Sequence, residues 1–192
     1  MKTPIRIGFV GVGQMGQAAH LRNYAALPDC EVVALSELRP QLAHRVAERY
    51  GVPRVYNSAA EMLLHEQLDG LVAAQQFDRH GQIIPPLYKA NIPIFTEKPL
   101  AASVAVGEGM LTALREAGTW HMLGYHKRSD PAVMWAKEEI DRLKTTGELG
   151  TLRYVRLLMP SGNWKAGGFD DLLTSDEPAP HIEADPADSD MD

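Results

Sequence analysis

The sequence holds a single cysteine, Cys30, among 192 residues. One cysteine cannot form an internal disulfide, and it gives no basis for a cysteine-based metal site. The N-terminus has no apolar stretch long enough for a signal peptide because Arg6 interrupts it, and no later run approaches membrane-spanning length. These absences predict a soluble, cytoplasmic protein that has no metal site.

An excess of basic residues is also missing. The formal net charge is −6, and residues 176–192 carry seven carboxylates and no Lys or Arg, which leaves +1 for residues 1–175. A nearly neutral body has no electrostatic footprint for nucleic acid. The acidic, proline-bearing end has the composition of a disordered segment, so we predict a solvated tail over residues 176–192.

Short apolar runs alternate with helical patterns over the first 120 residues. The predicted strands cover residues 5–10, 31–35, a short stretch around 55–56, 68–74, 92–96 and 119–123. The predicted helices cover residues 14–27, 40–51, 58–65, 80–90 and 103–117. The strands are near-continuous apolar runs, which is typical of a parallel sheet covered on both faces. Residues 1–123 are therefore predicted to form an α/β domain with a doubly wound parallel sheet.

A glycine-rich loop follows the first predicted strand. Gly11, Gly13 and Gly16 form the pattern G-x-G-x-x-G between this strand and a helix. The first glycine permits a tight turn, the second lets the backbone approach a pyrophosphate, and the third lets the helix pack close to the strand. Backbone N–H groups near Gln14 and Met15 would face the phosphates at the positive end of the helix. The loop therefore predicts a dinucleotide site.

The second predicted strand leads to Glu37, which lies 21 residues after Gly16. A carboxylate at this place can accept hydrogen bonds from the ribose hydroxyls of the adenosine, and it repels a 2′-phosphate. This favours NAD as the cofactor. Arg39 could pair with a phosphate, so NADP remains the alternative.

The fifth predicted strand ends in the sequence FTEKPLA, which places Glu97 and Lys98 at its carboxyl end. Ligands of open parallel sheets bind beyond these ends. A lysine there could donate a hydrogen bond to a substrate oxygen and stabilise the charge that develops during hydride transfer. Partial burial would lower the pKa of Lys98 and suit it to proton transfer. Pro99 allows a cis bond after Lys98. The alternative interpretation is a surface lysine in a turn.

The segments GVGQMG, FTEKPLA and LGYHKRSDPAV together resemble the Gfo/Idh/MocA oxidoreductases (glucose–fructose oxidoreductase, inositol dehydrogenase and relatives) over residues 5–160. The resemblance implies a Rossmann NAD(P)-binding domain followed by an α/β domain with a large open sheet. It also implies an oxidoreductase that acts on CH–OH groups and transfers a hydride between a nicotinamide and a sugar, polyol or related hydroxy compound.

The resemblance also implies roles for single residues. Lys98 matches the catalytic lysine, and Glu97 matches its neighbour beside the cofactor. Gln75 stands where the family usually has Thr-Pro-Asn, and it is expected to contact the cofactor. Further matches are His20, His80 and the segment that enters the substrate side, with Tyr125, His126 and Arg128. His126 is either a proton shuttle or a polar packing residue.

Residues 124–175 are predicted to begin a substrate and oligomerisation domain that is incomplete. A helix is expected from Pro131 to about Lys144, and a strand is expected over 151–159. The Asp and His that the family's second domain supplies have no counterpart, since no Asp-x-x-x-His pattern follows residue 160. The alternative function is therefore a non-catalytic dinucleotide-binding module. Apolar residues such as Leu157 and Leu158 predict a homo-oligomer or a partner chain that covers them.

Overall fold

The computed structural model describes residues 3–158, 162 and 169–188. The chain divides into two compact units, one formed by residues 1–124 together with 168–192, and the other by residues 125–167. Each unit is described by itself.

The first unit is built on a six-stranded sheet in which every neighbouring pair is parallel. The strands are β1 (Ile5–Val10), β2 (Cys30–Ser36), β3 (Arg54–Tyr56), β4 (Gly70–Ala73), β5 (Ile94–Glu97) and β6 (His121–Gly124). Their order is β3-β2-β1-β4-β5-β6, which is the order of the Rossmann fold. The predicted α/β doubly wound parallel sheet is confirmed.

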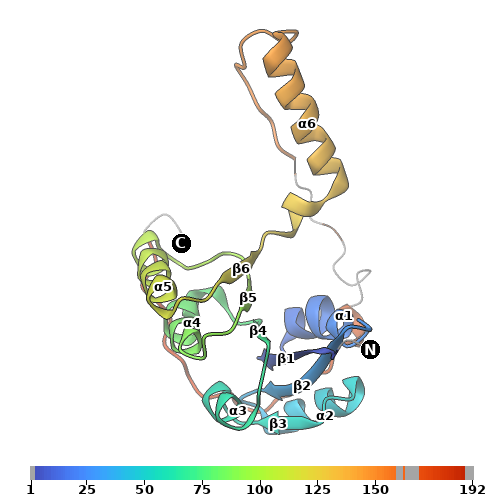
Figure 1. The fold of residues 1–192 in the computed structure, drawn as a ribbon, viewed down its shortest axis with the longest axis vertical. Helices are drawn as coiled ribbons and strands as arrows, with labels where there is room; N and C mark the ends of the chain where they lie inside the picture. Colours follow the sequence, from blue (N-terminus) through green and yellow to red (C-terminus); the bar gives the residue numbers. More distant parts are fainter. Residues whose placement is uncertain (1–2, 159–161, 163–168, 189–192) are drawn as a thin grey trace. The chain divides into compact units, whose positions relative to one another are not determined.

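Helices lie on both faces of this sheet (Figure 1). They are the π-helical turn η1 (Gly16–Leu21), α1 (Arg22–Tyr24), α2 (Pro40–Tyr50), α3 (Ala59–His65), the 3₁₀ turn η2 (Phe77–Arg79), α4 (His80–Tyr88) and α5 (Val104–Ala117). Figure 1 shows α1 and α2 on one side and α3, α4 and α5 on the other. After β3 the chain crosses to the other face of the sheet and continues with β4 on the far side of β1. This switch leaves a crevice at the carboxyl ends of β1 and β4, and ligands of such folds bind in this crevice.

The register of the central strands brings their carboxyl ends together. Val10 at the end of β1 pairs with Ser36 at the end of β2 and with Ala73 at the end of β4. The loops that follow these three strands therefore start side by side. These are the loops with the glycine pattern, Glu37 and Gln75.

The burial of the strands explains why their sequences are continuous apolar runs. All four residues of β4 are buried, as are the last four of β1 and the last five of β2. One apolar cluster includes Phe9 and Leu35 and packs against α2, and a second includes Val33 and Ile84 and packs against α3, α4 and α5. Each face of the sheet thus has its own core, as helices on both faces require.

Local signals determine most helix ends. Gly51 ends α2 in the left-handed conformation (φ 68°), and the hydroxyl of Ser58 accepts the Glu61 N–H at the start of α3. Ser58 and Glu61 form only half of a capping box, because the Glu61 carboxylate accepts the N–H of Asn57 and not that of Ser58. The helix predicted over 14–27 starts at 14 as expected but ends earlier, at Tyr24 at the end of α1.

The described residues of the second unit include one long helix. Their elements are the 3₁₀ turn η3 (His126–Ser129) and α6 (Pro131–Thr146). The Asp130 carboxylate caps α6 by accepting the Ala132 N–H at 2.9 Å, and Gly147 follows it with a φ of 74°. The strand predicted over 151–159 is wrong for 151–158, where no strand forms. A strand needs a neighbour to pair with, and the described residues of this unit offer none.

Two expectations about this unit stay predictions. Residue 159 of the predicted strand lies outside the described residues. Leu157 and Leu158 are exposed by 85% and 73%, so the association of the chain with a second copy or a partner stays a prediction.

Residues 176–188, the described part of the predicted solvated tail, make contacts with other residues of the first unit. Residues 169–188 begin with the 3₁₀ turn η5 (Phe169–Asp171) and belong to the first unit. Leu173 packs against the apolar cluster beneath α2, and Asp185 is 7% exposed. We call residues 169–188 the C-terminal segment. The last predicted tail residues, 189–192, lie outside the described residues.

Candidate functional site

The glycine loop has the geometry that its three glycines predict. Gly11 has a φ of +83°, which side-chain-bearing residues rarely adopt, and a Cβ there would lie 2.1 Å from Gln75 Nε2. A Cβ on Gly16 would lie 2.9 Å from the Gly11 carbonyl oxygen, so the helix packs tightly on the loop. A Cβ on Gly13 would meet nothing within 4 Å. The loop thus has one turn glycine, one packing glycine and one glycine that faces open space.

Glu37 joins the second strand to the glycine loop. Its side chain is buried, and its carboxylate accepts the N–H of Val12 at 3.1 Å. The same carboxylate binds Arg39 in a fork, with Nε at 2.8 Å and an Nη at 3.1 Å. The hydrogen bond from Glu37 raises the pKa of Arg39 above its ordinary value, against the lowering effect of burial. Arg39, which the sequence left open as a phosphate ligand, is therefore paired with Glu37.

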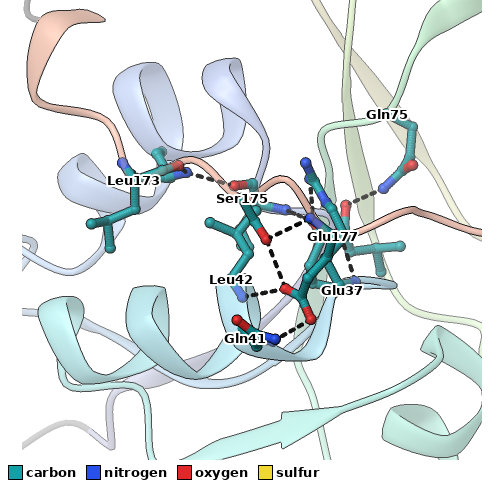
Figure 2. A network of polar contacts seen from close by, with 11 residues as sticks. Glu37, Gln41, Leu42, Gln75, Leu173, Ser175 and Glu177 are labelled. Carbon is teal, nitrogen blue, oxygen red and sulfur yellow. Dashed lines mark hydrogen bonds and ion pairs between the residues drawn. The ribbon is translucent and has the colours of Figure 1, made fainter.

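Gln75 supports the loop from the end of β4. Its Nε2 donates to the Val10 carbonyl at 2.8 Å, at the last residue of β1 (Figure 2). Gln75 thus makes a protein contact that fixes where the glycine turn begins. Its side chain is also part of the wall described next.

These three loops surround a cleft of about 720 Å³. This volume falls in the range of cofactor and ligand sites. Predicted cofactor residues on its wall are Gly11, Gly13, Gln14, Met15, Glu37 and Gln75. The structure therefore brings six of the predicted cofactor residues together. Gly16, Glu97 and Lys98 are not on this wall.

Glu97 is the last residue of β5 and Lys98 follows it, at the same carboxyl edge of the sheet. Glu97 Oε1 lies 2.8 Å from His20 Nε2, on the helix that follows the glycine loop, and Glu97 Oε2 accepts the Lys98 N–H at 3.2 Å. The Lys98–Pro99 bond is cis. Lys98 is exposed in this structure, because it stands beyond the end of the strand.

The histidines named by the sequence occupy different settings. His80 is fully buried, and its Nδ1–H donates to the Leu100 carbonyl at 3.0 Å, which is a structural role. His126 lies in the second unit, in η3, while Tyr125 just before it is contacted by the Arg128 guanidinium 5.4 Å above its ring. The described residues contain no group of three or more metal-ligating side chains suited to an ion.

The C-terminal segment is the part of the site that the sequence did not reveal. Both ends of the Gln17 side-chain amide bind the main chain of Leu173, with its Nε2 2.9 Å from the carbonyl and its Oε1 3.1 Å from the N–H. Leu173, Thr174 and Ser175 then continue along the wall of the cleft. The segment therefore closes one side of the space beside the glycine loop.

Three carboxylates of this segment bind the starts of three helices. Glu177 accepts N–H groups at the start of α2, Asp185 accepts the Gly81 N–H of α4 at 2.6 Å, and Asp188 accepts the Val104 N–H of α5 at 2.9 Å. These helices follow parallel strands, so they begin at the carboxyl edge of the sheet, where the positive ends of their dipoles gather. In the sequence, these helix-capping carboxylates were indicated only by an acidic run without basic residues. The same composition also fits a disordered segment.

A second hollow of about 720 Å³ lies at the opposite edge of the sheet. Its wall includes Ile5, Asp69, Pro93 and Trp120, at or before the amino ends of the strands. Ligands of open parallel sheets bind at the other edge, so this mostly apolar hollow is not the cofactor site.

The model of the oxidoreductase family with an NAD-binding Rossmann fold, Gfo/Idh/MocA, matches residues 5–125. The chain belongs to this family. Its Rossmann unit, with the glycine loop and Glu37 on one cleft, is the part that the family model describes. No helix among the described residues is both long and apolar enough to pass through a membrane.

Two similar proteins are named as inositol dehydrogenases. The chain is 24% identical to myo-inositol 2-dehydrogenase of Thermotoga maritima over 153 residues, which cover 80% of this chain and 44% of that protein. It is 26% identical to scyllo-inositol 2-dehydrogenase (NAD(+)) of Bacillus subtilis strain 168 over 157 residues, which cover 81% of this chain and 44% of that protein. The chain thus spans less than half the length of these relatives.

A solved structure of the family shows the same fold. The crystal structure of scyllo-inositol dehydrogenase from Lactobacillus casei with bound NAD(H) and scyllo-inositol aligns with a TM-score of 0.68 and 26% identity. The alignment covers 74% of this chain and 42% of that chain.

Proposed function

We propose that this chain is the NAD-binding part of an oxidoreductase that transfers a hydride between a nicotinamide and a CH–OH carbon of a sugar, polyol or related hydroxy compound. The observation that carries the proposal is the contact of the Glu37 carboxylate with the Val12 N–H, at 3.1 Å, on the wall of one cleft. This contact joins the phosphate-binding loop to the ribose-binding residue, the two parts that recognise a dinucleotide.

Residues of the cleft supply the binding. The open side of Gly13 and the backbone near Gln14 and Met15 would receive the pyrophosphate, since a Cβ on Gly13 meets nothing within 4 Å. Glu37 would accept the ribose hydroxyls. Gln75 holds the turn in place through Val10. The bound nicotinamide would accept or give up the hydride.

Lys98 is the proposed catalytic residue. Its backbone is held by Glu97, which also contacts His20 beside the glycine loop. The amine would donate a hydrogen bond to the oxygen on the reacting carbon and stabilise the charge that develops there. The exposure of the Lys98 side chain leaves its amine accessible to a substrate.

NAD is the proposed cofactor in place of NADP. Two contacts of the Glu37 carboxylate support this preference. It accepts a backbone N–H of the glycine loop, and both of its oxygens bind the Arg39 guanidinium, the group that a 2′-phosphate would need. The Bacillus subtilis relative is named for NAD(+), which agrees with the proposal.

A polyol and sugar panel tests the catalytic part of this proposal. NADH formation is measured with the whole chain, with the variant Lys98→Met and with the control Lys89→Met, an exposed lysine at the end of α4. We expect Lys98→Met to lower turnover by about 10²–10⁴-fold, the range for loss of a proton-transfer or oxyanion-binding group. Equal turnover in both variants would exclude Lys98. Cofactor binding without any turnover would favour the alternative, a non-catalytic dinucleotide-binding module.

A further inference from the structure

The first turn of α2 binds a carboxylate that comes from far along the chain. The two oxygens of Glu177 accept the N–H groups of Gln41 and Leu42, each at 3.1 Å (Figure 2). Pro40 at the first helical position has no N–H, and the Ala43 N–H donates to the Arg39 carbonyl at 2.9 Å. Glu177 therefore takes up both remaining donors of this turn.

The position of this carboxylate is held by its own segment. The Ser175 hydroxyl lies 2.8 Å from Glu177 Oε2 and also accepts the Glu177 N–H at 3.1 Å. Leu173, two residues before Ser175, is bound on both sides of its peptide by Gln17. Several contacts thus hold the Glu177 carboxylate in its position.

The surroundings keep Glu177 charged. Burial raises its pKa, but the hydrogen bonds from Gln41, Ser175 and Leu42, together with the nearby Arg39 charge, outweigh that effect and lower the pKa below its ordinary value. A negative charge therefore stands at the start of α2 at neutral pH.

This place matters because α2 starts directly after the residues that are proposed to meet the adenosine ribose. Glu37, Arg39 and Leu42 lie on the wall of the cleft, as does Ser175. A 2′-phosphate on the ribose needs cationic or N–H donors at this end of the cleft. Arg39 is already bound by Glu37, and the two N–H donors of α2 are bound by Glu177.

We propose that Glu177 is a specificity-determining residue, whose carboxylate fills the anion-binding start of α2 and, together with Glu37, excludes the 2′-phosphate of NADP from the cleft. The inference rests on the proposed function, because it requires a dinucleotide in this cleft. It gives the C-terminal segment a role in the choice between NAD and NADP, through the Glu177 carboxylate, which does not belong to the loop between β2 and α2.

Calorimetric titration of the full chain with NADH and with NADPH tests this proposal. In Glu177→Ala we expect the Kd for NADPH to fall at least about tenfold relative to the Kd for NADH. The reason is that the substitution removes a negative charge that repels the 2′-phosphate and frees two N–H donors to bind it. The Kd for NADH should change by less than about twofold, because Glu177 is not proposed to contact NAD. Glu177→Gln, which removes the charge and keeps the shape, should shift the ratio in the same direction and tests the proposal if Glu177→Ala does not fold.

The matched control is Glu183→Ala, in the same segment and with the same loss of charge. The contact of Glu183 with the Gln82 side chain is made by its main-chain carbonyl, so this variant should leave both affinities unchanged. An unchanged NADPH-to-NADH ratio in Glu177→Ala would overturn the proposal, and so would an equal tightening of both cofactors. Wild-type protein that binds neither cofactor would contradict the proposed function itself, an outcome distinct from an unchanged ratio.

Discussion

His20 Nε2 and Glu97 Oε1 lie 2.8 Å apart and join the helix after the glycine loop to the end of β5. Their side chains are only 12% and 14% exposed, and the His20 ring also lies 4.9 Å from the ring of Phe95. The other Glu97 oxygen accepts the Lys98 N–H. One carboxylate thus links the element that carries the proposed catalytic lysine to the element that would hold the pyrophosphate.

This link predicts an energetic coupling between the two side chains. The variants His20→Ala and Glu97→Ala, and the double variant, should show a coupling of about 0.5–3 kcal/mol in the free energy of unfolding, as expected for residues in contact. Urea unfolding of all four proteins measures it. If the effects of the two single substitutions on the free energy of unfolding sum to that of the double variant within about 0.5 kcal/mol, the two side chains do not stabilise each other.

The glycine loop should respond differently at two of its positions. Gly11→Ala should destabilise the fold by about 1–3 kcal/mol, because alanine would be forced to a positive φ. Gly13→Ala should change stability by less than about 0.5 kcal/mol, since its Cβ would enter open space. Thermal and urea unfolding of the two variants checks this difference.

A glycine in a regular helix provides the control for that comparison. Gly109 lies within α5, and a Cβ there would meet nothing within 4 Å. Gly109→Ala should stabilise the chain by about 0.5–1 kcal/mol through helix propensity alone. Equal effects at Gly11 and Gly109 would mean that the turn at Gly11 carries no special constraint.

Much of this fold could be predicted from local patterns. The glycine pattern after β1, the Pro40 and Gly51 pair around α2 and the caps at Ser58 and Ser103 are all set by neighbouring residues. The cleft residues were also predictable, because parallel strands bring their carboxyl ends to one edge.

The contacts of the C-terminal segment could not be predicted in the same way. Leu173 and Gln17 are 156 residues apart, and Glu177 and Gln41 are 136 apart, so no local pattern links them. Composition described the segment as acidic and proline-bearing, which fits both a solvated tail and a set of helix caps. The strand predicted around 151–158 failed for a related reason, because strand pairing depends on a partner and not on the run itself.

The helix-capping role of the C-terminal segment leads to a stability prediction. Asp185→Ala should destabilise the chain by about 0.5–2 kcal/mol, the range for loss of a helix cap, because the Gly81 N–H would lose its acceptor. Asp176→Ala removes an exposed carboxylate of the same segment and should change stability by less than about 0.5 kcal/mol. Denaturant unfolding compares them. Equal stabilities would show that the segment does not stabilise the first unit.

A partly buried histidine should make stability depend on pH. His121 lies between the hydroxyls of Tyr88 and Thr96, each 2.8 Å from a ring nitrogen, and burial, helped by His80, lowers the pKa of His121 to about 4. The unfolded chain binds this proton near its ordinary pKa of about 6.5, so the stability contribution is full above that pH and declines toward pH 4. The slope should be less than about 1.4 kcal/mol per pH unit, because partial exposure screens the effect.

Unfolding by urea between about pH 4 and pH 7 measures this dependence. His121→Gln should flatten the decline relative to the wild type over this interval. His44→Gln, at an exposed position of α2, should retain it. Parallel curves for the wild type and His121→Gln would contradict the assignment.

The central claim is that a dinucleotide binds in the cleft between the glycine loop and Glu37. Titration of the full chain with NADH, followed by energy transfer from tryptophan, tests it most directly when the variant Gly13→Val is titrated beside the wild type. The introduced valine side chain would occupy the open space against which the pyrophosphate is proposed to lie, and its Cβ would meet no protein atom within 4 Å. We expect saturable binding by the wild type and at least about tenfold weaker binding by the folded variant. Absent binding by the wild type, or equal affinity in both proteins, would contradict the claim.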